Sequence, residues 1–290
     1  MRPRMLACAI GKFDALHRGH QALIAAARAL GEPAIMTFTG MAAELGWEPR
    51  LPIIAEYDRQ ALLTAWGVRE TTLPFADIRG LDPAAFLHRV HALGVGAVVV
   101  GEDFRFGRDR SGNATELPAL AQAAGLQCQV IAAVRDERGA ISSSRVRAAL
   151  AAGDCATVHQ DLGRWHRLHG TVVHGEGRGR RLGVPTCNIG RWLNQPPGPG
   201  VYAAWARLDD SEAVIPAAVN AGHLPTVGGG RPFTVEAHLI DWSGDAYDRG
   251  ISIECVARLR EERKFSDLVA LQQQLTSDID AARSLLSRLR

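Results

Sequence analysis

Two histidines near the N-terminus stand where a strand is expected to give way to a helix. His17 and His20 flank Gly19 in the run His-Arg-Gly-His, shortly after the apolar segment Met5–Ile10. Folds of the α/β class bind ligands at such junctions, because the free backbone N–H groups and positive dipole end of a helix start favour phosphate. Imidazoles can also donate hydrogen bonds to phosphate oxygens as charge develops during transfer. The pattern predicts a phosphate-binding site; two solvent-facing loop histidines are the alternative.

A second group of residues suited to phosphate lies in the other half of the chain. Gly175, Gly177 and Gly179 alternate with other residues, and Arg178 stands among them. Three alternating glycines do not pack as an ordinary strand, so they favour a flap whose backbone comes close to a phosphate. A basic loop without a ligand is the alternative.

The elements that must position these residues differ between the two halves. Apolar segments of strand length alternate with helical segments over the first 150 residues, which predicts a doubly wound α/β domain. Strands are expected at Met5–Ile10, Pro33–Phe38, Gly96–Gly101 and Gln127–Ala132. Helices are expected at Gln21–Leu30, Tyr57–Trp66, Pro83–Leu93, Leu117–Ala124 and Ser143–Ala152.

From about Leu168 the period changes to short alternating strands separated by glycine-rich turns, which predicts a small antiparallel β-barrel followed by a C-terminal helix. The expected strands are His169–Val173, Val201–Leu208, Ala217–Asn220, Thr234–Ile240 and Ile251–Leu259, and the helix is Ser266–Arg290. The boundary between the halves is expected within Asp154–Arg167.

Composition narrows the class of protein. The chain has 290 residues, 47% of them hydrophobic, and a formal net charge of +2, which gives no support to a nucleic-acid-binding protein. No apolar run reaches the roughly 20 residues of a membrane span. The five cysteines are odd in number and form no Cys-x-x-Cys, and Met5–Ile10 is too short for a signal-peptide core, so free thiols and a cytoplasmic location are expected.

The run Gly11-Lys12-Phe13-Asp14-Ala15-Leu16-His17-Arg18-Gly19-His20 resembles the motif of HxGH nucleotidylyltransferases. The resemblance implies ATP binding and adenylyl transfer with release of pyrophosphate, with His17 and His20 as catalytic residues. It also implies ATP contacts from Gly11, Phe13, Asp14 and Gly19. Lys12 replaces the family's asparagine, and Ala15 replaces a glycine and is expected to strain the turn. The family's TFxPHP turn is absent, since the chain reads Thr37-Phe38-Thr39-Gly40-Met41.

Two further stretches of this half carry a resemblance. Ile141-Ser142-Ser143-Ser144-Arg145-Val146-Arg147 resembles the ISSTxIR motif, which implies that Arg147 and the three serines Ser142, Ser143 and Ser144 engage ATP; helix capping is the alternative for the serines. Val100–Gly107 resembles the GxDFxFG stretch of bacterial bifunctional riboflavin kinase/FAD synthetases, which implies flavin contacts from Asp103, Phe104 and Phe106. Since Phe104 and Phe106 alternate, one is expected to face the ligand while the other packs.

The second half resembles riboflavin kinases. Pro185-Thr186-Cys187-Asn188 matches their PTAN signature with cysteine in place of alanine, which implies that Thr186 and Asn188 supply oxygens to Mg²⁺ and ATP. Thr234-Val235-Glu236-Ala237-His238-Leu239 resembles the VExHL strand whose glutamate is the catalytic base; an ordinary surface glutamate is the alternative for Glu236. Val219–Gly222, Pro225-Thr226 and Lys264-Phe265 continue the resemblance.

Both motif sets predict a bifunctional enzyme. Residues 156–290 are expected to phosphorylate riboflavin to FMN, and residues 1–155 to adenylate FMN to FAD, with ATP, riboflavin and FMN as small-molecule substrates, Mg²⁺ as metal and no membrane or nucleic-acid partner. The alternative is a riboflavin kinase whose N-terminal domain is inactive, regulatory or specific for another substrate. The sequence leaves the oligomeric state open.

Overall fold

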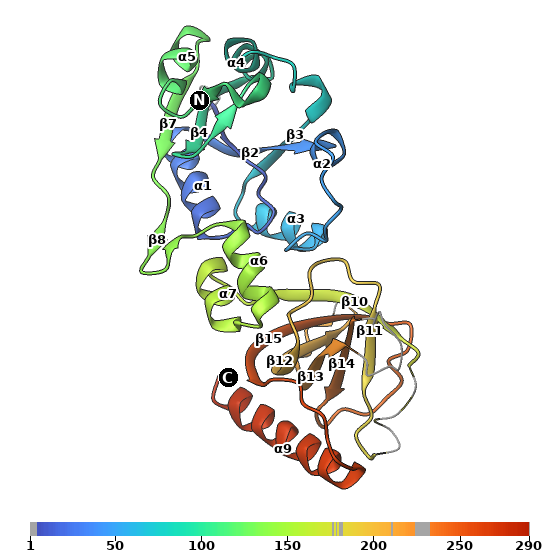
Figure 1. The fold of residues 1–290 in the computed structure, drawn as a ribbon. Helices are drawn as coiled ribbons and strands as arrows, with labels where there is room; N and C mark the ends of the chain where they lie inside the picture. The colour runs from blue at the N-terminus through green and yellow to red at the C-terminus, as the bar shows by residue number, and fades with distance from the viewer. Residues whose placement is uncertain are drawn as a thin grey trace. The chain divides into compact units, whose positions relative to one another are not determined.

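The computed structural model describes residues 5–175, 177, 179, 182–209, 211–223 and 233–289. The chain forms two compact units (Figure 1). Unit 1 comprises Met1–Arg50 and Glu56–Ser142, and unit 2 comprises Leu51–Ala55 and Ser143–Arg290.

A parallel sheet forms the centre of unit 1, in the strand order β3-β2-β1-β4-β7 (Figure 1). Its strands are β1 (Leu6–Ile10), β2 (Glu32–Thr39), β3 (Arg69–Pro74), β4 (Val95–Gly101) and β7 (Gln127–Ile131). The chain runs outward from β1 in one direction, then returns to continue from β4 in the other. The predicted doubly wound α/β fold is therefore confirmed, and the strand order reverses between β1 and β4.

Helices cover both faces of this sheet. They are α1 (Arg18–Leu30), α3 (Glu56–Ala65), α4 (Pro83–Ala92) and α5 (Leu117–Ala123). Cys8 and Ile10 on β1 share one buried cluster with Phe86 of α4 and Leu117 of α5. Side chains alternate along a strand, so the neighbouring residues of β1 face the other side, where α1 lies against β1, β2 and β4. All five helices expected in this half are present within a few residues, including Ser143–Ala152, which forms α6 in unit 2.

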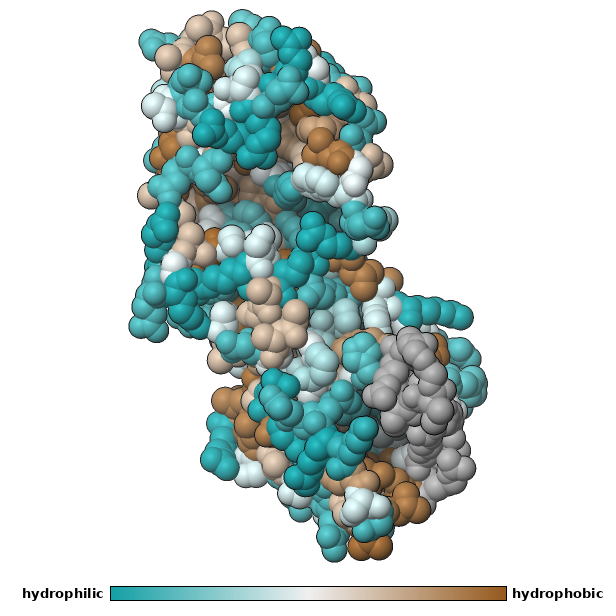
Figure 2. Space-filling view, viewed as in Figure 1, coloured by the Kyte–Doolittle hydropathy of each residue, from teal (hydrophilic) through white to brown (hydrophobic). Residues whose placement is uncertain are grey.

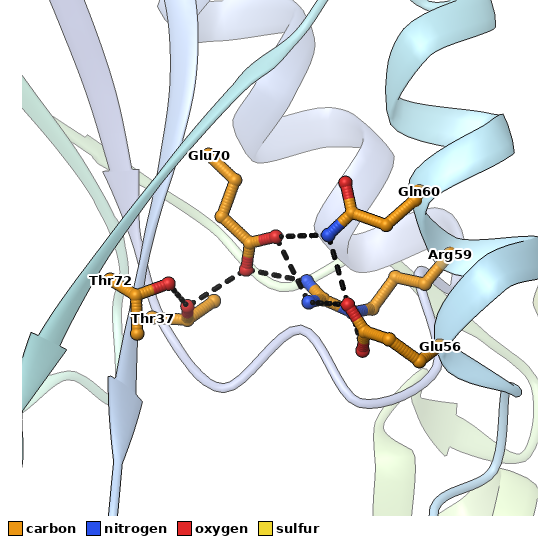
Figure 3. A network of polar contacts seen from close by, with 6 residues as sticks. All are labelled: Thr37, Glu56, Arg59, Gln60, Glu70 and Thr72. Carbon is orange, nitrogen blue, oxygen red and sulfur yellow. Dashed lines mark hydrogen bonds and ion pairs between the residues drawn. The ribbon is translucent and has the colours of Figure 1, made fainter.

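The edge strand β3 is the one element of the central sheet that the sequence reading misses. Its residues Arg69–Pro74 are mostly polar, and only Leu73 is buried, so no apolar run marks the strand. Glu70 instead anchors it through a polar network (Figure 3): Arg59 on α3 donates to both of its oxygens at 2.6 and 2.9 Å, and Thr37 Oγ1 on β2 donates at 2.8 Å. Gln60 donates as well, at 2.8 Å. Burial alone would raise the pKa of Glu70, but these hydrogen bonds hold it below its ordinary value.

Short elements complete unit 1. They are α2 (Met41–Glu44), the 3₁₀ turns Phe75–Asp77 and Arg108–Arg110, and the two-residue strands β5 (Arg105–Phe106), β6 (Gly112–Asn113), β8 (Arg135–Asp136) and β9 (Gly139–Ala140).

Unit 2 is built on a closed antiparallel barrel in the order β10-β11-β14-β13-β12-β15 (Figure 1). Its described strands are β10 (Arg167–Val173), β11 (Cys187–Gly190), β12 (Gly200–Leu208), β13 (Ile215–His223), β14 (Phe233–Leu239) and β15 (Gly250–Arg260). Alternate residues point inward; Val219, Val235 and Ala237 belong to the barrel core. The predicted barrel is confirmed, and the four-residue β11 is the strand that was not expected.

Among the described residues, three helices flank the barrel: α6 (Ser143–Ala152), α7 (Cys155–Leu162) and α9 (Leu268–Ser287). Helix α9, the predicted C-terminal helix, packs Ala282 and Leu286 against Ala203 and Val256 of the barrel wall. Helix α7 was not predicted. It is tied to α6 by Arg145, whose guanidinium lies 2.7 Å from the fully buried carboxylate of Asp161.

Candidate active sites

The loop after β1 carries the two histidines of unit 1. His17 is the N-cap of α1 and is buried, and its Nδ1 accepts a hydrogen bond from the backbone N–H of His20 at 3.3 Å. The two imidazole rings stack with centroids 3.7 Å apart, and Phe13 lies 4.8 Å from the ring of His20. The helix therefore begins at Arg18, earlier than the sequence predicts, and the two histidines form one rigid pair at its start.

Gly19 explains the spacing of this motif. A Cβ atom at position 19 would lie 3.0 Å from Cε1 of His17 and 3.4 Å from the carbonyl oxygen of Ile141. Phe13 and Leu16 adopt left-handed backbone conformations (φ 50° and 47°) and are fully buried. Ala15, by contrast, has no positive φ, so the strain expected at this alanine is absent. Phe13 and Leu16 adopt the left-handed conformation instead.

The stretch after β4 lies at the same edge of the sheet, because β1 and β4 are adjacent and parallel. Asp103 and Phe104 line a cavity of about 570 Å³. Phe106 is only 5% exposed and contacts Phe86 in the core, with ring centroids 5.7 Å apart. The two phenylalanines thus divide as expected, with Phe104 at the cavity and Phe106 in the core. Asp14 and Gly11 lie in the adjoining β1 loop, and Gly11 donates its N–H to Met36 at 3.1 Å.

The serine-rich segment spans the two units. Ser142 ends unit 1, whereas Ser143 and Ser144 open α6 of unit 2. Arg147 lies one turn further along α6, where its Nη1 donates to the carbonyl of Leu51 at 2.9 Å and to Oε1 of Gln195 at 2.5 Å. These contacts hold the Leu51–Ala55 segment to unit 2.

In unit 2 the residues of the PTCN sequence separate by alternation along β11. Cys187 packs against the barrel core and pairs with Ala237, whereas Thr186 and Asn188 line a cavity on the outer face of the barrel. Burial raises the pKa of the Cys187 thiol, which is therefore uncharged at neutral pH.

Glu236 stands in the middle of a polar row across three strands. On β14 it pairs in antiparallel register with Asn188 of β11 on one side and with Asn220 of β13 on the other. Directly paired residues share a face of the sheet, and all three line the same cavity. The row places the carboxylate of Glu236 between two amides. The carboxylate can accept a proton, and the amides can form hydrogen bonds with polar groups beside it.

The glycine segment lies over this row. A Cβ atom on Gly175 would lie 2.1 Å from Nδ2 of Asn188, and one on Gly179 would lie 3.1 Å from Oγ1 of Thr186. The backbone at these two glycines therefore packs against the two oxygen-bearing side chains more closely than a residue with a Cβ could. His238 contacts the backbone just before Thr186, since its Nδ1 lies 2.8 Å from the carbonyl oxygen of Pro185.

The cavity that contains these residues has a volume of about 1020 Å³ and an apolar end. Leu268, Leu271 and Leu275 of α9 line that end, together with Phe265, over whose ring the guanidinium of Arg263 lies at 5.1 Å. Figure 2 shows hydrophobic residues gathered where α9 begins, and Leu268 is 68% exposed. The apolar side chains of this helix thus divide: those of its first half face the cavity, and those of its second half pack on the barrel.

The donor atoms in this cavity suit a hard cation that is carried by a phosphate ligand. Thr186 and Asn188 offer oxygens, and both residues line the cavity. Within the described ranges no three or more His, Cys, Asp or Glu side chains group as a metal site. A magnesium ion here would depend on nucleotide oxygens for most of its ligands, which fits its habit of retaining water and phosphate.

Some expected contacts lie outside the described residues, namely Arg178, Pro225 and Thr226. Two residues without a predicted role lie in the site: Asn220 and His238. Asn220 belongs to the stretch Val219–Gly222 and His238 to the VExHL-like strand. Because Glu236 and His238 are two residues apart on one strand, their side chains lie on the same face. The position of Asn220 opposite Glu236 depends on register between strands, which no local pattern gives.

Comparison with known proteins matches a different family to each part of the chain. Residues 1–145 match the FAD synthetase family, and residues 162–286 match the riboflavin kinase family. A bifunctional riboflavin kinase/FMN adenylyltransferase of Pseudomonas fluorescens is 36% identical over 98% of this chain and 95% of its own length. FAD synthetase 2 of Arabidopsis thaliana, chloroplastic, is 41% identical over 73% of this chain, which spans 63% of that relative.

A solved structure has the same fold. A crystal structure described as a macrolide-efflux protein from Streptococcus pneumoniae superposes with a TM-score of 0.85, with 28% identity over 98% of this chain and 95% of its own. In the part of this chain that is described, no helix is long and apolar enough to cross a membrane.

Proposed function

The chain belongs to the bifunctional riboflavin kinase/FMN adenylyltransferase family, and from this premise we propose that its two units catalyse two consecutive ATP-dependent reactions. Unit 2 transfers the γ-phosphoryl group of ATP to the terminal hydroxyl of riboflavin and makes FMN. Unit 1 joins the phosphate of FMN to the α-phosphorus of ATP, releases pyrophosphate and makes FAD. The observation that carries the kinase assignment is the row Asn188–Glu236–Asn220 inside a cavity with an apolar end.

In the kinase reaction Glu236 accepts the proton of the attacking hydroxyl. A carboxylate within hydrogen-bond reach of that hydroxyl supplies general-base catalysis, and Asn188 and Asn220 on either side hold its orientation. The leucines of α9 and Phe265 offer an apolar surface of the kind that a flat flavin ring system needs. Thr186 and Asn188 would hold Mg²⁺, which supplies charge neutralisation on the ATP phosphates when it is bound.

In the adenylyl transfer the stacked pair of His17 and His20 faces the phosphates. The start of α1 supplies backbone N–H groups, and the imidazoles donate hydrogen bonds to the oxygens on which negative charge develops. Phe104 and Asp103 lie at the adjoining strand end, where the cavity accepts the flavin. Ser142, the last residue of unit 1, is a further ATP contact in this proposal, whereas Ser143, Ser144 and Arg147 belong to unit 2 and stay predictions.

A single assay tests both halves. The purified protein is incubated with ATP and Mg²⁺, once with riboflavin and once with FMN, and the flavins are separated by chromatography. The proposal predicts FMN and FAD from riboflavin and FAD from FMN. FMN without FAD in either incubation would leave a kinase with a different or inactive unit 1, and failure to make FMN would refute the kinase assignment.

A further inference from the structure

Two departures from the family pattern meet in unit 1. Lys12 replaces an asparagine in the loop after β1, and the segment after β2 lacks the expected proline–histidine turn. In its place, Gly40 (φ 75°) leads into the short helix α2, and the chain continues to Trp47. The ammonium group of Lys12 lies 4.0 Å from the centroid of the Trp47 ring. This cation–π contact joins the two departures into one local structure.

The same structure gathers positive charge. Lys12, Trp47 and Arg50 line a cavity of about 670 Å³, with Glu48 as its carboxylate. Within the described residues none of the three cations Lys12, Arg50 and Arg110 forms an ion pair, although at least twelve other arginine side chains do. Burial, Arg110 and Arg50 lower the pKa of Lys12, and Asp14 acts in the opposite direction. These cations repel one another and have no paired carboxylate. An anion bound among them would relieve that repulsion.

The position of this cluster indicates which anion. Lys12 follows β1 by two residues, at the point where the strand order reverses, and stands in the same loop as His17. Arg110 lines the neighbouring cavity together with Asp103 and Phe104. We propose that Lys12 and Arg50, with Trp47 as the surface that holds the lysine, form a phosphate-binding subsite of unit 1 that takes a phosphate group of ATP or of FMN. This subsite deepens the proposed adenylyl transfer and rests on it for the identity of the ligand.

Steady-state kinetics of FAD formation identify the source of the phosphate. Lys12→Met and Arg50→Met are each expected to raise the KM for one substrate about tenfold, the size of one lost charge-assisted contact. A raised KM for ATP would show that the subsite binds a phosphate of the nucleotide. A raised KM for FMN would show that it binds the phosphate of the flavin. Lys12→Arg should restore the value, and Arg89→Met, which removes an exposed cation of α4, should change neither. Unchanged KM values for both substrates in Lys12→Met would overturn the subsite.

A binding measurement separates this proposal from the adenylyl transfer itself. The difference in fluorescence between the wild-type protein and Trp47→Phe isolates the emission of Trp47 during titration with inorganic pyrophosphate. A saturable change is expected, with its midpoint shifted about tenfold in Lys12→Met. If the protein shows this saturable response but makes no FAD, the phosphate-binding subsite is supported and the proposed adenylyl transfer is refuted. A difference signal that does not respond to pyrophosphate would refute the subsite even in an active enzyme.

Discussion

Asn188 on β11 lies directly opposite Glu236 on β14, and both side chains line the cavity of unit 2. The pairing brings the proposed magnesium- and ATP-contacting residue beside the proposed base, although they are far apart in the sequence. Cys187, one residue away, faces the barrel core instead. The alternation of a single short strand therefore separates the polar from the apolar positions of the Pro-Thr-Cys-Asn motif.

Glu236→Gln should remove the base while preserving its shape. Riboflavin phosphorylation is expected to fall by roughly 10² to 10⁴, the range for loss of general acid–base catalysis, while FAD formation from FMN continues. The rates are measured by chromatography of the flavins. Glu261→Gln, at an 85% exposed side chain outside the cavity lining, is the control. Equal losses of riboflavin phosphorylation in the two variants would contradict the assignment of Glu236 as the general base.

His20→Ala should impair the other reaction. Removal of the ring that stacks on His17 is expected to lower FAD formation from FMN by roughly 10² to 10⁴, because transition-state charge loses a donor and His17 loses its neighbour. Riboflavin phosphorylation should be unaffected. His88→Ala, at an exposed position of α4, should leave both reactions intact. A full rate of FAD formation in His20→Ala would remove the histidine pair from the mechanism.

Gly179→Ala tests the close approach of the glycine segment. The added Cβ would lie 2.3 Å from the carbonyl oxygen of Val184 and 3.1 Å from Oγ1 of Thr186, so backbone must move beside the proposed phosphate site. We expect the KM for ATP in the kinase reaction to rise about tenfold. The FMN-to-FAD reaction in the same protein is the internal control, and an unchanged KM for ATP would exclude this role.

Cys187→Ala should be nearly neutral. Because burial raises its pKa, the thiol is protonated at neutral pH and contributes packing alone. The kcat/KM for riboflavin is expected to stay within about a factor of two, and alanine is the residue of the family motif. A large loss would mean that the sulfur takes part in catalysis.

Glu70 supplies a stability prediction with a definite pH dependence. Glu70→Gln should lower the stability of unit 1 by about 1–3 kcal/mol at pH 7, because Arg59 loses the more buried of its two carboxylate partners and keeps only the exposed Glu56. The pKa of Glu70 in the folded protein lies below its ordinary value of 4.5, so its contribution is present above about pH 4.5 and is lost as pH falls through the folded-state pKa.

Urea denaturation followed across this range measures the effect. The stability difference between wild type and Glu70→Gln should shrink toward zero at acidic pH. Glu32→Gln is the matched control, because its 3.4 Å ion pair with Arg69 is exposed and worth little. A difference that persists at low pH would show that the charge of Glu70 is not its source.

The sequence predicts the parts of the molecule whose signals are local. The apolar run of β4, the capped helix α6 and the alternating strands β12 and β15 appear near their expected bounds. The edge strand β3 is missed because its residues Arg69–Pro74 are stabilised by a side-chain network and not by an apolar face. Long-range pairing is likewise invisible to local patterns, which is why Asn220 and the Lys12–Trp47 contact emerge only from the structure.

Mixing two variants tests most directly whether the chain holds two independent active sites. With riboflavin, ATP and Mg²⁺, Glu236→Gln alone should make FMN and FAD only at its roughly 10² to 10⁴ lower rate, and His20→Ala alone should accumulate FMN with little FAD. Combined in one tube, the two proteins should make FAD, because FMN released by one is adenylated by the other. Absence of FAD from the mixture, with FMN accumulating and Glu236→Gln inactive toward added FMN, would contradict the division of the two reactions between the units.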